Sequence, residues 1–216
     1  MKTIIVYLCF FLGTLNCSGI VNDNKKDSLP DDIKEGILSE KKLWISSLSK
    51  IDPGFELGRF NYVSKDNFSL DYTEDNFFSS DWLKVYEDFI FPSPDGLKFI
   101  DIYSTKVSFI QEQGKKLALF EIDTKVHLID KELDKSQLIA FSGTEEHFQD
   151  CYWLDNNTFT LMGVKETLNG TQETRYVPFI WVYNIRSGEK VEYLYSTLLT
   201  GYNDSYFNNK YQIESL

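Results

Sequence analysis

Short strand patterns separated by turn signals fill the second half of the chain, and their spacing constrains the fold more than any other feature. Apolar and β-branched residues gather in short runs, and turn pairs such as Asp95-Gly96 and Ser187-Gly188 stand between them. The strands expected from these runs cover residues 98–103, 107–110, 117–122, 126–130, 138–141, 148–154, 158–164, 177–185 and 190–195. This arrangement predicts a mainly β fold made of antiparallel sheets.

Two parts of the β region are similar to each other. Residues 126–141 and 180–195 each contain a strand that ends in Asp or Asn, a turn and a return strand, and a turn followed by a strand precedes each part. The pattern over residues 91–197 resembles the blade meanders of β-propellers. A closed propeller needs about four blades or more and the chain has room for about three, so we expect packed or incomplete-propeller sheets.

Residues 31–49 form the one segment with a clear helical pattern. Apolar side chains recur at helical spacing along it, and a turn signal follows at Asp52-Pro53-Gly54. These apolar residues are Ile33, Ile37, Trp44 and Leu48. The pattern predicts a single N-terminal α-helix that packs on an edge or a face of a sheet, since exposed edge strands need a cover.

The first residues carry the pattern of an export signal. Lys2 precedes an apolar run over residues 4–15, which is shorter than the roughly 20 residues that a membrane-spanning helix needs. We therefore expect residues 1–16 to be a signal peptide. Leu15-Asn16-Cys17 resembles the lipobox of bacterial lipoproteins, and the looser lipoboxes of Bacteroidetes lipoproteins tolerate Asn16 at a position that normally holds a small residue. The resemblance implies that Cys17 is lipidated; the alternative is cleavage after Gly19 and secretion.

The stretch behind this signal is polar and charged. It offers too little apolar area to offset the entropy of ordering it, so we expect residues 17–30 to form a flexible tether. The remaining residues, 31–216, suffice for a single mainly β domain with its own core. Cys151 is the one cysteine of that domain, which therefore has no internal disulfide.

The charge of the chain excludes one class of partner. The formal net charge is −11, the sequence pI is about 4.7, and no cluster of Lys or Arg offsets this charge locally. An acidic surface repels the phosphates of nucleic acids, so nucleic-acid binding is excluded.

Residues with catalytic or ligand chemistry are few. His147 and Cys151 share strand parity, which would place them on one face as a Cys-His dyad, although a small thiol among large apolar residues is more typical of packing. Glu145, Glu146, His147 and Asp150 are the densest group of possible metal ligands, but they lack zinc or calcium spacing. His127 is expected to be a solvated or hydrogen-bonded strand residue. No cofactor motif is present, and we assign no catalytic, cofactor-binding or metal-binding residue.

Aromatic residues are frequent in residues 60–91, where amides and carboxylates interrupt them. The alternation of Phe68, Leu70 and Tyr72 predicts one further strand, whereas residues 82–86 fit a short helix or a strand equally well. Exposed rings beside polar groups would suit sugar binding, and buried rings would form a core. The aromatic residues are Phe60, Tyr62, Phe68, Tyr72, Phe77, Phe78, Trp82, Tyr86, Phe89 and Phe91.

Three functions remain. The leading hypothesis is an exported protein of the cell envelope, anchored to the membrane through a lipid on Cys17, with a non-catalytic binding or structural role toward an envelope protein or a glycan. The first alternative is a carbohydrate-binding or carbohydrate-processing accessory protein that uses the aromatic residues of 60–91. The second is a secreted hydrolase that uses His147 and an acidic partner.

Overall fold

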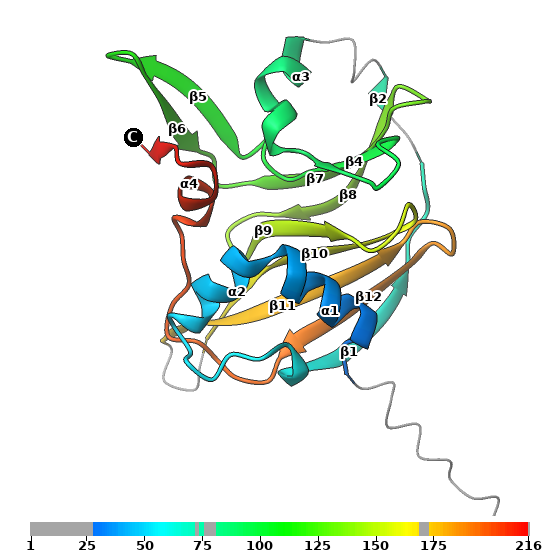
Figure 1. Cartoon of the computed structure of the whole chain (residues 1–216), viewed down its shortest axis with the longest axis vertical. Helices are drawn as coiled ribbons and strands as arrows, with labels where there is room; N and C mark the ends of the chain where they lie inside the picture. The colour runs from blue at the N-terminus through cyan, green and yellow to red at the C-terminus, as the bar shows by residue number, and fades with distance from the viewer. Residues whose placement is uncertain (1–27, 72–73, 76–80, 169–172, 216) are drawn as a thin grey trace, which may run out of the picture.

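A computed structural model describes residues 28–71, 74–75, 81–168 and 173–215 (Figure 1). Most of its regular structure is β, and nearly all strand pairs are antiparallel, which confirms the predicted class. All nine strands expected beyond residue 97 are present, with ends that differ by a few residues. Residues 82–86, which the sequence left open, lie in the helix α3 (Asp81–Tyr86).

One five-stranded sheet, which we call the helix-covered sheet, has the order β1-β12-β11-β10-β9. Its last four strands in sequence form an antiparallel meander, and β1 adds to the outer edge of β12. The strands are β1 (Phe60–Asn67), β9 (Glu146–Trp153), β10 (Thr158–Leu168), β11 (Thr174–Asn184) and β12 (Glu189–Tyr195).

The second five-stranded sheet has the order β2-β8-β7-β4-β3. Its strand order matches that of the helix-covered sheet. Strands β3, β4, β7 and β8 form an antiparallel meander, and β2, from earlier in the chain, pairs with β8. The strands are β2 (Glu74–Asp75), β3 (Phe91–Pro92), β4 (Lys98–Asp101), β7 (Thr124–Asp130) and β8 (Lys135–Ser142).

A hairpin inserted between β4 and β7 breaks the similarity of the two sheets. It consists of β5 (Val107–Glu112) and β6 (Lys115–Phe120), and it projects from the rest of the molecule in Figure 1. Its tight turn places Gln113 and Gly114 at φ values of 49° and 82°, as two-residue hairpin turns require. Strand β13 (Glu214–Ser215) pairs in parallel with β6 near the C-terminus.

The prediction of one N-terminal helix over residues 31–49 is wrong in the number of helices. The segment forms two helices, α1 (Asp31–Glu40) and α2 (Lys42–Ser49), because Lys41 between them leaves helical geometry at φ −116° and ψ 39°. The Lys41 ammonium reaches a buried carboxylate on β9, a tertiary contact that helical periodicity does not reveal. Further short helices follow: η1 (Leu57–Arg59), α3, η2 (Glu87–Phe89) and α4 (Tyr206–Tyr211).

Helices α1 and α2 cover one face of the helix-covered sheet (Figure 1). Their apolar residues Ile37 and Trp44 are fully buried against Met162 and Ile180 of the sheet. Burial of apolar side chains at this density holds the layers together, at about 25 cal/mol per Å² removed from water. The second core lies between the two five-stranded sheets, which makes three layers: helices, sheet and sheet.

Two expectations near the N-terminal side need correction. The predicted strand over residues 68–72 is wrong, because Phe68 and Leu70 lie outside any strand and Tyr72 lies outside the described residues. The chain instead leaves β1 and runs to the second sheet, and Phe68 packs on Tyr183 at 5.3 Å between ring centroids. Leu29, placed at the end of the expected tether, is buried beneath α1, and Ser28 pairs with Asn61.

Candidate functional site

A β-bulge in β9 determines which side chains face the candidate site. Phe148 pairs with Gly163 and Asp150 with Met162, so Gln149 is an extra residue without a partner on β10. The bulge brings the His147 carbonyl so close to Gly163 that a Cβ at this position would overlap it. An extra residue exchanges the faces of the residues on its two sides.

The bulge separates the two residues of the predicted dyad. Cys151 faces the core between the sheets with Phe148 and is 1% exposed, whereas His147 is on the other side of the strand. The expectation that their side chains share a face is therefore wrong. Burial raises the pKa of the Cys151 thiol far above its ordinary value, so the thiol stays protonated and poorly nucleophilic.

His147 lies between a carboxylate and an aromatic ring. Its Nε2 is 3.0 Å from Glu166 Oε1 on β10, and its ring stacks on Tyr202 at 4.6 Å between centroids. Glu146, one of the acidic neighbours in sequence, instead pairs with Lys165 at 2.9 Å. The acidic partner of His147 is thus Glu166, which antiparallel pairing brings across from the neighbouring strand.

Asp150 anchors a buried ionic network next to the bulge. Its carboxylate is 3.2 Å from the Lys41 ammonium and 2.9 Å from that of Lys210 on α4. It also accepts hydrogen bonds from the Tyr206 hydroxyl and the Cys151 amide. Both ammonium groups lie over the Phe91 ring as well. The network ties the α1–α2 junction and α4 to β9.

A cavity of about 570 Å³ opens where the hairpin β5–β6, strand β9 and the segment before α4 meet. Its size lies in the range of small-molecule sites. We call it the hairpin pocket. Its lining residues are Tyr103, Lys106, Phe120, Glu121, Ile122, Thr144, His147, Phe148, Gln149, Glu166, Tyr202, Asn203, Asp204, Ser205, Tyr206, Phe207, Asn208 and Ser215.

Four titratable groups that line the hairpin pocket have shifted pKa values, and sequence reasoning missed all of them: Lys106, Tyr202, Tyr103 and Tyr206. Burial lowers the pKa of Lys106 to about 8, and burial followed by the charge of Asp204 raises the pKa of Tyr202 to about 12. Perturbed groups in a concave site are typical of binding and catalytic sites. No motif marks these residues, because they converge from segments far apart in the sequence.

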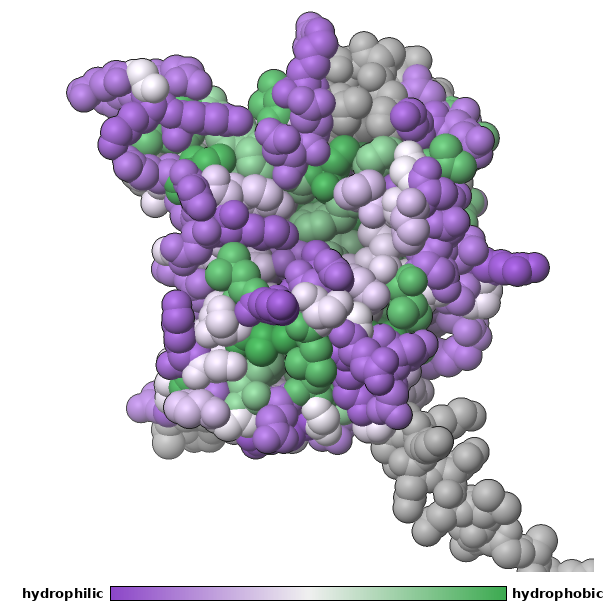
Figure 2. Space-filling view, viewed as in Figure 1, coloured by the Kyte–Doolittle hydropathy of each residue, from purple (hydrophilic) through white to green (hydrophobic). Residues whose placement is uncertain are grey.

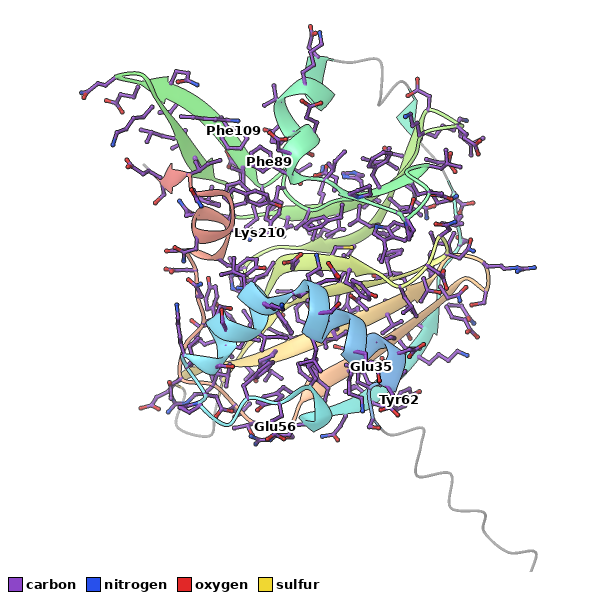
Figure 3. The ribbon with its side chains drawn as sticks, in the orientation of Figure 1. Glu35, Glu56, Tyr62, Phe89, Phe109 and Lys210 are labelled. Carbon is purple, nitrogen blue, oxygen red and sulfur yellow. The ribbon has the colours of Figure 1, made fainter. Side chains whose placement is uncertain are left out.

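The aromatic residues of 60–91 do not form the exposed platform of the sugar hypothesis where the structure describes them. Phe60, Phe89 and Phe91 are buried. Phe89 stacks on Phe109 of the hairpin, with 5.1 Å between the ring centroids, and Figure 3 labels the two residues near each other. Tyr62 is 42% exposed. Phe68 and Tyr86 are partly buried, while Tyr72, Phe77, Phe78 and the side chain of Trp82 lie outside the described residues.

The remaining sequence candidates lie apart from the hairpin pocket. His127 is buried on β7 opposite Asp101, whose pKa burial raises. Over the described ranges, no set of three or more His, Cys, Asp or Glu side chains converges in a way that would hold a metal ion. Cys17 and the predicted signal peptide lie outside the described residues. Among the described residues, no helix is long and apolar enough to cross a membrane.

A second hollow lies on the outer side of α2, where Figure 2 shows apolar side chains at the surface. Leu38, Ile45 and Lys42 line it, and Leu38 is 53% exposed. The hollow is open, and the hydroxyls of Ser46 and Ser49 that line it are already bonded to backbone carbonyls of their own helix. The hairpin pocket is therefore the better candidate for a specific ligand.

Comparison with known proteins finds no matching family model, no matching curated protein and no matching solved structure.

Proposed function

We propose that the protein is an exported, non-catalytic binding protein of the cell envelope, tethered to the membrane through a lipid on Cys17, and that the hairpin pocket is its ligand site. The single observation that carries the binding role is the hairpin pocket itself. Its walls come from an inserted hairpin, a bulged strand and the C-terminal segment, and its lining combines aromatic rings with several polar groups.

Binding fits this pocket better than hydrolysis. His147 is already paired with Glu166, and in the described part of the chain no hydroxyl or thiol forms a hydrogen bond with its ring. Nucleophilic catalysis needs such a pair within about 2.6–3.2 Å. The buried Cys151 cannot serve, because it lies on the opposite face of the sheet.

We also propose that the two five-stranded sheets are blade-like repeats of one unit. Their matching strand order supports this proposal, and so do equivalent turns. The carboxylate of Asp130, the last residue of β7, accepts the Glu132 amide at 3.0 Å, and the side chain of Asn184, the last residue of β11, accepts the Ser187 amide at 2.9 Å. The hairpin β5–β6 is then an insertion into the first unit, which adds a wall for a ligand site.

A panel of small molecules tests the binding role. We expect at least one class among organic acids, sugars, amines and amino acids to raise the melting temperature of the protein. Thr144→Trp, which fills the hairpin pocket, should abolish that rise, whereas Ser108→Trp, at an exposed position outside it, should not. A response that Thr144→Trp leaves unchanged would place the ligand elsewhere.

Membrane partition tests the anchor. Expressed with its own leader in a Gram-negative host, the protein should fractionate with membranes and incorporate labelled palmitate. Cys17→Ser should release it to the soluble fraction, whereas Ser18→Ala should leave its partition unchanged. Equal partition of the Cys17→Ser variant would contradict the anchor without bearing on the hairpin pocket.

A further inference from the structure

Lys106 has no partner in the hairpin pocket. Its ammonium pairs with no carboxylate and donates no hydrogen bond to any part of the chain that the structure describes, although it lines a cavity. The lysines around Asp150, by contrast, are both paired. A partly desolvated charge without a counter-charge is unfavourable, and an anionic group of a ligand would compensate it.

Two exposed apolar side chains line the same cavity as Lys106. Phe120 is 40% exposed and Ile122 is 72% exposed. At the base of the hairpin Val107 pairs with Phe120, and the Glu121 amide donates to the Lys106 carbonyl at 2.7 Å, so Glu121 lies opposite Lys106. The cavity is thus lined by a cation and by uncovered apolar surface. A ligand with an anionic head and an apolar body matches both features.

The surrounding acids restrict the charge of that ligand. Glu121 and Asp204 are exposed at the hairpin pocket, Glu166 is held by His147, and the chain as a whole carries −11. These charges disfavour a phosphate or another polyanion far more than a single carboxylate.

We propose that the hairpin pocket binds a monoanionic organic acid, with its carboxylate on Lys106 and its apolar body against Phe120 and Ile122. This inference rests on the proposed function, since it names the ligand class of the same site.

The proposal implies a pH limit. Because the pKa of Lys106 is about 8 in the folded protein, the ammonium that attracts the carboxylate is lost as the pH rises above this value. Tyr202 keeps its proton in this range, and the pKa of Tyr206 is raised further still. The other charged or titratable groups that line the hairpin pocket are Glu121, His147, Glu166, Asp204 and Tyr103.

Calorimetric titration of the full chain with cyclohexanecarboxylate tests the proposal. We expect binding at pH 7 that weakens about tenfold or more by pH 9.5. The neutral amide of the same acid, acetate and inorganic phosphate should each bind at least about tenfold more weakly, since each lacks one of the matched features.

Three variants give the decisive comparison. Lys106→Met should abolish binding, and Lys125→Met, an exposed lysine outside the hairpin pocket, should not change it. Lys106→Arg should keep binding at pH 9.5, because a guanidinium stays charged there. Circular dichroism checks that each variant is folded.

Each failure has its own meaning. If the amide binds as tightly as the acid, or if Lys106→Met binds the acid normally, the proposed ligand class is wrong. The binding role still stands in that case if another class of small molecule raises the melting temperature and Thr144→Trp abolishes that rise. If no acid, sugar, amine or amino acid of the panel binds, both the inference and the proposed function fail.

Discussion

The buried carboxylate of Asp150 has more partners than any other side chain described above. Two ammonium groups, a phenol and a backbone amide converge on it, and its exposed fraction is 2%. A buried carboxylate without partners lowers the stability of the folded protein, so Asp150 is tolerated only because its partners compensate the charge. The residue therefore fixes the position of α4, which carries one wall of the hairpin pocket.

Asp150→Asn should lower the free energy of unfolding by about 3 kcal/mol, because it leaves the two lysines without a counter-charge. Urea denaturation measures the change. Glu214→Gln is the matched control, since it breaks an ion pair with Lys115 that is about two-thirds exposed, and it should cost less than about 1 kcal/mol. Equal effects of the two variants would contradict the buried network.

Lys106 should make stability rise with pH. Its pKa is about 8 when folded and 10.5 in the unfolded chain, so between these values the unfolded chain binds the proton that the folded protein has lost. We expect the free energy of unfolding to increase by about 1–2 kcal/mol between pH 7.5 and 9.5 from this residue.

Urea denaturation at both pH values, compared with Lys106→Met, isolates this contribution. The upper pH of the experiment stays below 10, the ordinary pKa of tyrosine. Above that pH, buried tyrosines with a raised pKa, such as Tyr183 and Tyr211, would make stability fall as the pH rises and would mask the effect of Lys106. An identical pH dependence in the variant would show that the ammonium is well solvated.

At the scale of elements, alternation and turn residues predicted the strands because each strand has one face in a core. The break at Lys41 and the bulge at Gln149 escaped prediction for one reason. Both depend on partners distant in sequence, Asp150 for Lys41 and Gly163 opposite the bulge. The bulge also explains why the face of His147 was misassigned while its strand was predicted correctly. The hairpin pocket could not be predicted, since its walls meet only in the folded chain.

Gly36 in α1 tests the packing of helix on sheet. Alanine normally favours a helix by about 1 kcal/mol, but a Cβ at this position would overlap the ring of Tyr152 on β9. Gly36→Ala should therefore lower the free energy of unfolding by about 1–3 kcal/mol.

Thermal or urea denaturation gives the value, and Gly58→Ala, whose Cβ would meet nothing within 4 Å, should change it by less than about 0.5 kcal/mol. Combining Gly36→Ala with Tyr152→Ala should remove the penalty of the first change. A stabilised Gly36→Ala single variant would mean that the Tyr152 ring does not stay against α1 as described.

At the scale of the whole molecule, two similar sheets share one core, helices cover one outer face, and an inserted hairpin adds a ligand-sized cavity. The two sheets and helices provide rigidity, and the irregular parts provide the hairpin pocket. This division is common, since functional residues concentrate in insertions and loops that a rigid scaffold positions. If the proposed anchor holds the protein outside the cytoplasm, this cavity is where it would meet small molecules of its surroundings.

Crystallographic soaking with a set of small organic fragments tests the central claim most directly, because it locates binding without assuming a ligand. We predict that fragments gather in the hairpin pocket, and that those with a carboxylate place it within hydrogen-bond distance of the Lys106 ammonium. Fragments that leave this cavity empty and gather instead in the hollow outside α2 would contradict the account.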